Sequence, residues 1–473
     1  MSREKIKADL AIIGAGAAGL VSAAGAAMLG RKVVLFEAGL MGGDCLNYGC
    51  VPSKAILTAA HKVAEIKKAA KYGITAGEPQ VDFAKVRAHI AQSIADIELN
   101  DSQERFEGFG VRVIRERAQF QDARTIVSDS VEVRAKRMVV ATGTRAFIPP
   151  IPGLKDAPYL TNESIWSLEA LPEHLIILGA GPIGSELGQA FARLGSKVSI
   201  LEVGKPLSVF EPEHASLVID ALKADGVDLR SEERAEAVRE TSQGIEVDTS
   251  SGDTLAGSHL LVATGRIPVF DGLNLDAAGI ETDQRGIVCD DRLKTSNPRV
   301  YAAGDIAGKG ALTHIAGWHG SVIVRNLYFG LPTKQSSQPI PGAVYTDPPI
   351  ASIGLSEAKA REIHGNAISV AEFGFDDVDR AIAEGDTRGG AKLVLGKKGQ
   401  ILGAHIVGAR ADDLVQIAQS VMANGGKVRA LTSAVAPYPT RGEIFKRAAG
   451  KHFEPTVFGP GFKLWSSILN FFH

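Results

Sequence analysis

Two cysteines lie five residues apart near the N-terminus, in the segment G-G-D-C-L-N-Y-G-C-V-P-S-K at 42–54. In a regular helix the Cα atoms of Cys45 and Cys50 would be ~8.6 Å apart, whereas a disulfide needs less than ~7 Å. A redox-active bridge therefore requires a distorted first turn, which Gly49 permits. The alternative is a pair of buried thiols that never react. A metal site is disfavoured, because no second Cys or His pair lies nearby.

Lys54 closes the same segment and follows Pro52, near a predicted helix start. The dipole of a helix disfavours a cation at that end. The placement indicates a specific partner for the ammonium group, and the alternative is a solvated lysine.

Two glycine-rich segments each follow an apolar strand and precede a helix: G-A-G-A-A-G at 14–19 and G-A-G-P-I-G at 179–184. Such glycines let the backbone approach a pyrophosphate, and the helix start offers free N–H groups and a positive dipole end. An acidic residue, Glu37 or Glu202, ends the next strand at about the expected 20-residue distance and can bind an adenosine ribose. The alternative is a tight turn without a ligand. The duplicated unit predicts two bound dinucleotides, one of them a flavin.

The remaining pattern favours an α/β fold. Short apolar strands ending in V-V-A-T-G-T at 139–144 and L-V-A-T-G-R at 261–266 close the two units. From 342 to about 453, alternating strands and helices predict a further domain. Helices are also expected at 53–72, 83–107 and 314–329.

Composition narrows the class of protein. At ~150 residues per domain, 473 residues predict about three domains. Lys+Arg 52 against Asp+Glu 54 leaves no basic footprint for nucleic acid, and 45% hydrophobic with 22% charged residues excludes disorder. Three cysteines give no disulfide framework, which favours a reducing compartment. Glycines interrupt the apolar run at 10–29, so we expect neither a signal peptide nor a membrane span, and a cytoplasmic location.

The chain ends in an apolar segment, F-K-L-W-S-S-I-L-N-F-F-H at 462–473. It is too short to cross a bilayer, which takes ~20 residues. We expect it to lie on a membrane, to pack on a protein partner or to pack on its own dimer. The apolar residues near helical spacing are Phe462, Trp465, Ile468, Leu469 and Phe472.

The cysteine motif, both glycine-rich units, both A-T-G turns and A-G-D at 303–305 resemble the flavoprotein pyridine nucleotide–disulfide oxidoreductases. That family includes dihydrolipoamide dehydrogenase, glutathione reductase and mercuric reductase, and the resemblance covers about residues 8–453. It implies two Rossmann-like domains, for FAD and NAD, and a C-terminal α+β dimerisation domain. The implied parts are 1–148, the FAD-binding domain; 149–268, the NAD-binding domain; 269–338, a central return to the FAD domain; 339–453, the dimerisation domain; and 454–473, an amphipathic tail.

The resemblance also implies roles for individual residues. In such enzymes NAD(P)H reduces FAD, and FAD reduces the adjacent disulfide. Cys50 would lie against the flavin and form a charge-transfer thiolate, while Cys45 would exchange with substrate. Lys54 would lie near flavin N5 and pair with Glu186. The implied cofactor-binding residues are Gly14, Gly16, Gly19, Glu37, Gly43, Thr142, Gly143, Asp305, Thr313 and His314, together with Gly179, Gly181, Gly184, Glu202, Gly265 and Arg266.

One position departs from the family pattern. Disulfide reductases of this family carry a His-Pro-Thr-x-x-Glu element that serves the interchange thiol across the dimer, but here A-P-Y-P-T-R-G-E at 436–443 has Tyr438 in place of the His and keeps Glu443. Mercuric reductases also have Pro-Tyr there, yet they end in a vicinal Cys pair, and the last cysteine here is Cys289. Asp44 and Tyr48 also replace the usual Thr and Val.

We therefore predict a homodimeric, FAD-dependent, NAD-preferring oxidoreductase that acts on a small-molecule or protein-bound dithiol or disulfide. It resembles dihydrolipoamide dehydrogenase without the catalytic His. One alternative is a mercuric-reductase-like metal or quinone reductase. Another is a flavin- and nucleotide-binding partner subunit with little turnover, against which the intact cysteine pair argues.

Overall fold

The structure is a computed structural model that describes residues 3–472. Residues 1, 2 and 473 and the side chain of Phe472 lie outside the described residues, and with them the ends of the predicted FAD domain and tail. The chain forms two compact units, each built from several segments. The first comprises Met1–Gly179, Ala190–Leu201 and Glu233–Ser337, and the second Ala180–Gln189, Glu202–Glu232 and Gln338–His473.

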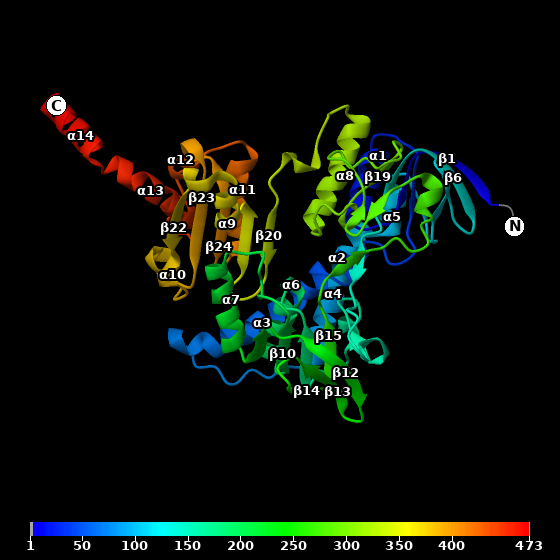
Figure 1. The fold of residues 1–473 in the computed structure, drawn as a ribbon, viewed down its shortest axis with the longest axis horizontal. Helices are drawn as coiled ribbons and strands as arrows, with labels where there is room; N and C mark the ends of the chain where they lie inside the picture. The colour runs from blue at the N-terminus through cyan, green and yellow to red at the C-terminus, as the bar shows by residue number, and fades with distance from the viewer. Residues whose placement is uncertain (1–2, 473) are drawn as a thin grey trace. The chain divides into compact units, whose positions relative to one another are not determined.

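The first unit contains a mainly parallel sheet in the order β3-β2-β1-β6-β5-β4, with β19 also paired to β6 (Figure 1). β1 lies between β2 and β6, parallel to both, and its residues 10–13 are buried. Strands covered on both faces form continuous apolar runs, which explains the segment D-L-A-I-I at 9–13. The strands are β1 (Glu4–Ile13), β2 (Val33–Phe36), β3 (Val111–Ile114), β4 (Gln119–Asp122), β5 (Thr125–Val127), β6 (Val131–Val140) and β19 (Val300–Ala302).

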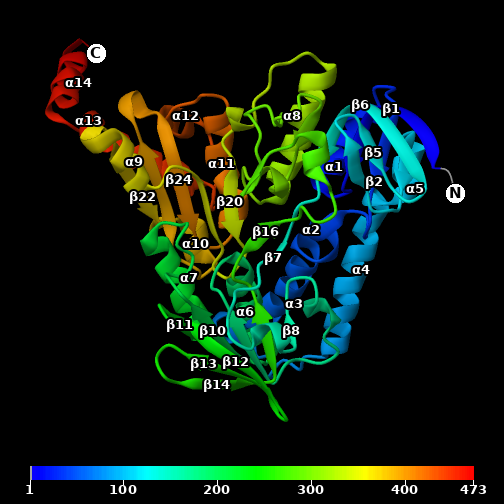
Figure 2. The same cartoon turned by 45° about the vertical axis from the view of Figure 1, so that its right-hand side comes forward.

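Helices pack closely in this unit. The helices are α1 (Ala17–Ala27), α2 (Gly43–Asn47), α3 (Cys50–Lys68), α4 (Phe83–Asp101), α5 (Gln103–Gly108) and α8 (Thr313–Tyr328). α3 and α4 lie side by side (Figure 2). α1 and α8 contact through glycines, since a Cβ on Gly25 would lie 2.9 Å from Val324 Cγ2 and one on Gly320 would lie 2.8 Å from Ala18 O. The helices expected at 53–72 and 314–329 are thus confirmed, while the stretch expected at 83–107 is divided into α4 and α5 at Ser102.

A second parallel arrangement, in the order β10-β9-β15-β8, repeats the pattern of the first sheet. α6 (Pro182–Leu194) connects β9 to β10, as α1 connects β1 to β2. The duplication expected from the sequence is therefore confirmed. The parallel strands are β8 (Tyr159–Leu160), β9 (His174–Leu178), β10 (Lys197–Glu202) and β15 (His259–Val262). Three small antiparallel sheets are formed by β12 (Ala235–Thr241), β13 (Gly244–Thr249) and β14 (Thr254–Gly257); by β7 (Thr144–Ala146) and β16 (Arg266–Pro268); and by β17 (Thr282–Asp283) and β18 (Gly286–Ile287).

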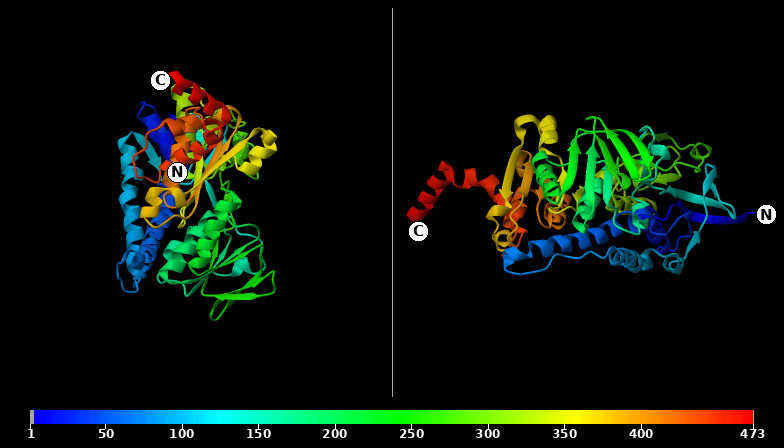
Figure 3. Two further views of the ribbon diagram at one scale, coloured as in Figure 1. Left: turned by 90° about the vertical axis from the view of Figure 1, so that its left-hand side faces the viewer. Right: turned by 90° about the horizontal axis from the view of Figure 1, so that it is seen from below.

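The second unit contains an antiparallel sheet in the order β20-β21-β24-β23-β22. Its core includes residues of α11 and α13, and α14 extends α13 away from the sheet (Figure 3). The strands of this sheet are β20 (Pro341–Val344), β21 (Ile350–Gly354), β22 (Ser369–Gly374), β23 (Gly390–Leu395) and β24 (Ile401–Val407), and the unit also contains β11 (Val227–Ser231) outside the sheet. The helices are α7 (Pro212–Ala224), α9 (Glu357–His364), α10 (Asp379–Ala383), α11 (Ala411–Ala423), α12 (Val428–Ser433), α13 (Glu443–Val457) and α14 (Pro460–Phe472).

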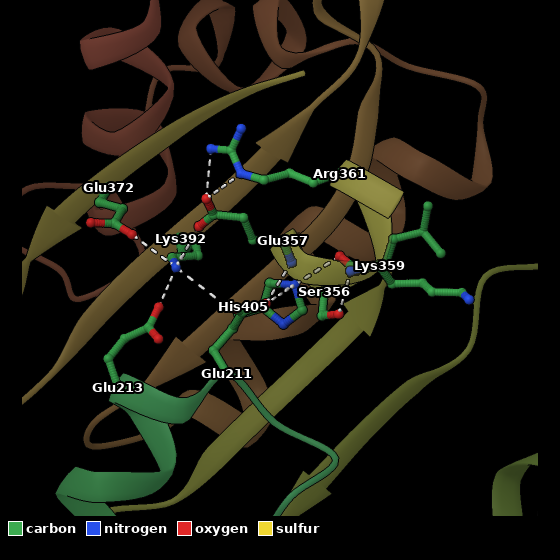
Figure 4. Close-up of polar contacts among 10 residues, drawn as sticks. Glu211, Glu213, Ser356, Glu357, Lys359, Arg361, Glu372, Lys392 and His405 are labelled. Atoms are coloured by element: carbon green, nitrogen blue, oxygen red, sulfur yellow. Dashed lines mark hydrogen bonds and ion pairs between the residues drawn. The ribbon is translucent and has the colours of Figure 1, made fainter. Parts of the chain in front are cut away.

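A cluster of carboxylates around the buried Lys392 connects α7, α9 and two strands of this sheet (Figure 4). The Lys392 ammonium contacts four carboxylates, among them Glu357 at 3.0 Å and Glu372 at 3.1 Å. Burial alone would lower the pKa of Lys392, but hydrogen bonds to Glu213 and these two carboxylates raise it. The lysine is therefore held charged inside the unit, where an unpaired charge would be costly.

The predicted five-part division stays a prediction, because compactness groups the chain into two units instead. The first sheet takes strands from 4–140 and 300–302, and the antiparallel sheet lies wholly within 341–407. None of the helices within residues 3–472 combines the length and apolar content needed to cross a membrane.

Candidate active site

The first glycine-rich turn has no room for side chains. Gly14 has a φ of +105°, and a Cβ there would lie 2.3 Å from Ala141 O. A Cβ on Gly19, inside α1, would lie 1.9 Å from Gly14 O. Only glycine satisfies both the positive φ and the close approach of the backbone. The predicted turn residues Thr142 and Gly143 lie directly beyond this contact.

Two helix starts meet beside this turn. Gly16 is the N-cap of α1 and Gly43 is the first residue of α2, and a Cβ on Gly43 would lie 2.8 Å from Gly16 Cα. The N-cap residues of α1 and α2 are Gly16 and Gly42, and no side chain caps either helix start. Free N–H groups at such a bare helix start suit an anionic pyrophosphate. The residues present therefore fit the dinucleotide that the sequence predicts.

Glu37 lies just after β2, as predicted, and holds the glycine-rich turn in place. Its Oε2 accepts the Ala15 N–H at 2.7 Å, and its Oε1 accepts the Gly39 N–H at 2.6 Å. An ionised carboxylate has about four acceptor positions, so capacity for a ribose hydroxyl remains.

The two cysteines lie on different helices. Cys45 is in α2, Cys50 opens α3, and the helix breaks at Tyr48 and Gly49. A Cβ on Gly49 would lie 3.1 Å from Asp44 O and 3.3 Å from Cys45 Cα. The distortion that the spacing required is thus present, and the glycine allows the close approach. The cysteines are separate thiols in this structure.

The two cysteine side chains have different surroundings. A hydrogen bond with the Cys50 side chain is the largest cause that raises the pKa of Cys45, and burial adds to it. Cys50 Sγ is exposed and lies 3.2 Å from Oγ1 of Thr313, the first residue of α8. The N-terminal end of a helix stabilises negative charge. The pKa of Cys45 is thus held above its usual range, and Cys50 lies at the N-terminal ends of α3 and α8. His314, the next predicted residue, is exposed.

A polar chain connects the cysteine motif to the A-G-D segment. Asp305, in the short 3-10 helix η5 (Asp305–Ala307), accepts the Thr144 hydroxyl at 2.8 Å, and burial raises the pKa of its carboxyl. Arg266 donates to Thr144 Oγ1 at 2.8 Å and lies 3.3 Å from Asp44 Oδ1. Asn162 donates to the same Asp44 oxygen at 2.9 Å. Arg266 therefore contacts the cysteine motif through Asp44.

Sequence reasoning missed Thr144, Asn162 and the buried His319. The His319 Nδ1 accepts the Gly304 N–H at 3.1 Å, beside Asp305, and burial lowers its pKa to about 4. A signal was available for His319, because it lies five residues after the noted His314 on the same helix. Nothing in the local sequence indicates Asn162.

The second glycine-rich turn repeats the first. Gly179 has a φ of +102°, and a Cβ there would lie 2.6 Å from Ala263 O. Glu202 Oε2 accepts the Ala180 N–H at 2.7 Å. Gly181 lies just before α6, Gly184 lies within it, and Gly265 has a φ of +148° after β15.

The other predicted catalytic residues have the following contacts. The Lys54 ammonium donates to Ser53 Oγ at 3.3 Å, and Glu186 Oε1 accepts the Tyr345 N–H at 3.0 Å. Their pairing stays a prediction. Among residues 3–472, no group of three or more His, Cys, Asp or Glu side chains could hold a metal ion.

Tyr438 is 70% exposed, and its hydroxyl donates to Asp379 Oδ2 at 2.7 Å. This bond raises the pKa of Tyr438. Glu443, the other predicted residue of this element, opens α13, and Asp379 is the observed partner of the Tyr438 hydroxyl. Contacts between sequence-distant residues such as these depend on tertiary packing.

Two cysteines at the break between α2 and α3, beside one of two dinucleotide-binding turns, are typical of a flavin-dependent disulfide oxidoreductase. The sequence matches the pyridine nucleotide-disulphide oxidoreductase model over residues 8–320 and the dimerisation domain of the same family over 340–449. The chain belongs to the pyridine nucleotide-disulphide oxidoreductase family, whose members use FAD and NAD(P)H.

Individual relatives differ in what they are named for. A mercuric reductase of Streptomyces lividans is 35% identical, over 93% of this chain and 95% of the relative. A dihydrolipoyl dehydrogenase of Geobacillus stearothermophilus is 34% identical, over 94% and 96%. The HOCl-induced flavoprotein disulfide reductase RclA of Escherichia coli, solved as a Cu(II) complex, superposes with a TM-score of 0.84 at 27% identity, over 93% and 98%. The chain is thus an FAD-dependent disulfide oxidoreductase of this general type.

Proposed function

We propose that this protein transfers electrons from NADH to a disulfide-containing substrate, or in reverse, through Cys45 and Cys50. The observation that carries the proposal is the placement of Cys50 at the start of α3, 3.2 Å from Thr313 at the start of α8. This arrangement supports a thiolate at Cys50 and leaves Cys45 as the thiol that exchanges with substrate.

The first glycine-rich turn and its neighbours would hold FAD. Gly14, Gly16 and Gly43 would admit the pyrophosphate, and Glu37 would bind the ribose. FAD supplies, when bound, a two-electron carrier between NAD(P)H and the cysteine pair. Asp305 would bind the ribityl or pyrophosphate region, supported by its hydrogen bond from Thr144.

The second turn would hold the nicotinamide cofactor, with NADH preferred. Glu202 ends β10, where its carboxylate can bind a ribose 2′-hydroxyl and would repel a 2′-phosphate. Lys197 and Lys205 are close in sequence and would soften the discrimination. We further propose a homodimer formed through the dimerisation domain, with Lys54 paired to Glu186 at the flavin.

A second candidate substrate is a metal ion or a quinone. Mercuric reductases are among the relatives, RclA was solved with Cu(II), and Tyr438 stands where dithiol enzymes of the family have His. Tyr438 would then position or ligate the substrate from the neighbouring subunit. The absence from the sequence of a C-terminal vicinal cysteine pair argues against an Hg(II) route identical to that of mercuric reductases.

Steady-state turnover tests these candidates. The pKa of Tyr438 is raised by its bond to Asp379, so Tyr438 is a proton donor at pH 7 and a poor base. We expect slow oxidation of dihydrolipoamide, and Tyr438→His should increase it by about 10²-fold, the lower range for a positioned general base. Turnover with NADH as the electron donor is measured with lipoamide, Hg(II) and quinones as the acceptors.

Each result has a distinct meaning. Fast dihydrolipoamide oxidation that Tyr438→Phe leaves unchanged would contradict the role given to Tyr438. Turnover only with Hg(II) or quinones would favour the second candidate. No turnover with any acceptor would favour a partner subunit that binds nucleotides without catalysis.

A further inference from the structure

The C-terminal helix α14 is amphipathic and exposes its apolar side. Leu464 and Ile468 lie one turn apart, and Trp465 and Leu469 form a parallel row beside them. Phe462, Leu464, Trp465, Ile468 and Leu469 are each between 41% and 65% exposed. Lys463, Ser466, Ser467 and Asn470 occupy the remaining side of the helix.

Within residues 3–472, the rest of the chain does not cover this face. α13 is anchored through Ile444, Phe445, Ala448 and Ala449, which belong to the core of the second unit. From residue 454 to 471 every residue except Gly459 is exposed. Figure 3 shows α14 extending beyond the sheet of this unit. The bend before α14 also contains a hollow of about 720 Å³ whose lining includes Pro455, Phe462 and Trp465.

The charge of the segment favours one kind of partner. Lys463 is the only ionisable side chain between residues 455 and 472, and no carboxylate lies there. Upstream on α13, Lys446 and Arg447 add further positive charge, while Lys451 is paired with Glu454 at 3.0 Å. A helix with aromatic and aliphatic residues on one face and lysine on the other suits the interface of a bilayer that contains anionic lipids.

The size of the face argues against a protein partner held by α14 alone. A helix of 13 residues is about 20 Å long and about 10 Å wide, so one side covers about 200 Å². A stable protein interface buries about 800 Å² on each partner. A bilayer requires no such complementary area, because affinity scales with the apolar surface inserted.

We propose that α14 is a membrane-surface anchor, whose apolar face inserts into the headgroup–acyl boundary of a bilayer while α13 connects it to the second unit. The helix lies in the plane of the surface. The polar face carries one charge, so binding depends mainly on apolar insertion and is strengthened by anionic lipid.

The test uses the full-length flavoprotein with vesicles of phosphatidylcholine, with and without phosphatidylglycerol. Flotation measures the bound fraction, and a blue shift of Trp465 fluorescence reports insertion, with Trp465→Phe removing the shift. The double variant Leu464→Ser with Ile468→Ser should bind vesicles more weakly by a factor of about ten or more. Lys463→Glu should weaken binding only to vesicles that contain phosphatidylglycerol.

A matched control makes the same chemical change elsewhere in the second unit. Ile363 and Ile382 are 53% and 54% exposed, on α9 and α10. Ile363→Ser with Ile382→Ser should bind vesicles like the unmodified protein. Bound flavin, measured by absorbance, checks that every variant is folded.

Two outcomes would overturn the proposal. In one, the protein stays with the vesicle-free fraction for both lipid compositions. In the other, sedimentation without vesicles shows that the α14 double variant splits a larger assembly, which would assign the face to a second copy of the chain. Vesicle binding that the α14 variant loses and the control keeps would support the anchor.

Discussion

The two glycine-rich turns have nearly the same geometry. Gly14 and Gly179 have φ values of +105° and +102°. In each turn the carboxylate at the end of the next strand, Glu37 or Glu202, accepts the N–H of the residue after the glycine at 2.7 Å. The carboxylate therefore fixes the turn itself before it contacts any ligand.

What surrounds the two turns differs. At the first, a second helix starts at Gly43, where a Cβ would lie 2.8 Å from Gly16 Cα, and that helix carries Cys45. At the second, Leu207 donates its backbone N–H to Ala180 O at 3.2 Å, and the next cysteine in the sequence is Cys289. The comparison teaches that the duplicated turn supplies binding, while the redox chemistry depends on a short segment added beside one copy.

The largest expected effect separates binding from chemistry at the first turn. Cys50→Ala should reduce disulfide turnover by about 10³-fold or more, because the variant removes a reacting sulfur and leaves both turns intact. FAD content and reduction by NADH should persist. The long-wavelength absorbance band of a thiolate beside FAD, seen on titration with NADH, should disappear.

Cys289 offers a matched control. Burial raises the pKa of its thiol to about 11, and it lies outside the cysteine motif. Cys289→Ala should keep both turnover and the absorbance band. Loss of turnover in this variant, or a retained band in Cys50→Ala, would contradict the assignment of the redox pair.

The next prediction tests whether the two turns bind different cofactors. Gly14→Ala would place a Cβ 2.3 Å from Ala141 O, and Gly179→Ala would place one 2.6 Å from Ala263 O, both at positive φ. We expect Gly14→Ala to weaken FAD binding by about 100-fold. Gly179→Ala should retain FAD and weaken NADH by a similar factor. Flavin absorbance and NADH titration measure the two affinities. Loss of FAD in both variants would contradict the assignment of different cofactors to the two turns.

Both turns were predictable from the sequence because their constraints are local. The positive φ at Gly14 and the carboxylate at Glu37 act within about 20 residues of each other, so their spacing carries the signal. The break between Cys45 and Cys50 was predictable for the same reason, since helix geometry could not accommodate a bridge.

The contacts that join distant segments were not predictable. Arg266 lies between Thr144 and Asp44 because two strands and a helix start meet in space. The same holds for Tyr438, whose partner Asp379 lies 59 residues earlier. Neither pairing leaves a pattern in the local sequence, since packing alone brings the side chains together.

A smaller effect concerns one buried histidine in each unit. Burial lowers the pKa of His319 and of His214 to about 4, from the ordinary histidine value of about 6.5. Between these pH values the unfolded chain binds the proton and the folded chain does not, so stability is full above pH 6.5 and falls as the pH approaches 4. Each histidine should reduce the free energy of unfolding by about 2 kcal/mol between pH 7 and pH 5.

Glutamine substitutions test whether both histidines are held neutral in the folded protein. His319→Gln keeps an acceptor for the Gly304 N–H but has no group that titrates. Urea unfolding, followed by tryptophan fluorescence at pH 5 and pH 7, should show a shallower pH dependence for His319→Gln and for His214→Gln. An unchanged pH dependence in either variant would mean that the histidine is not held neutral in the fold.

The smallest expected effect distinguishes the two carboxylates. Glu202→Gln removes the negative charge that would repel a 2′-phosphate, while the amide oxygen can still accept the Ala180 N–H. The ratio of the specificity constants for NADH and NADPH should fall by about tenfold, which corresponds to about 1.4 kcal/mol. Glu37→Gln, the matched change at the first turn, should alter FAD affinity and leave that ratio unchanged. If the unmodified protein already uses NADH and NADPH equally, Glu202 does not select the coenzyme, and its hydrogen bond to the turn is its whole role.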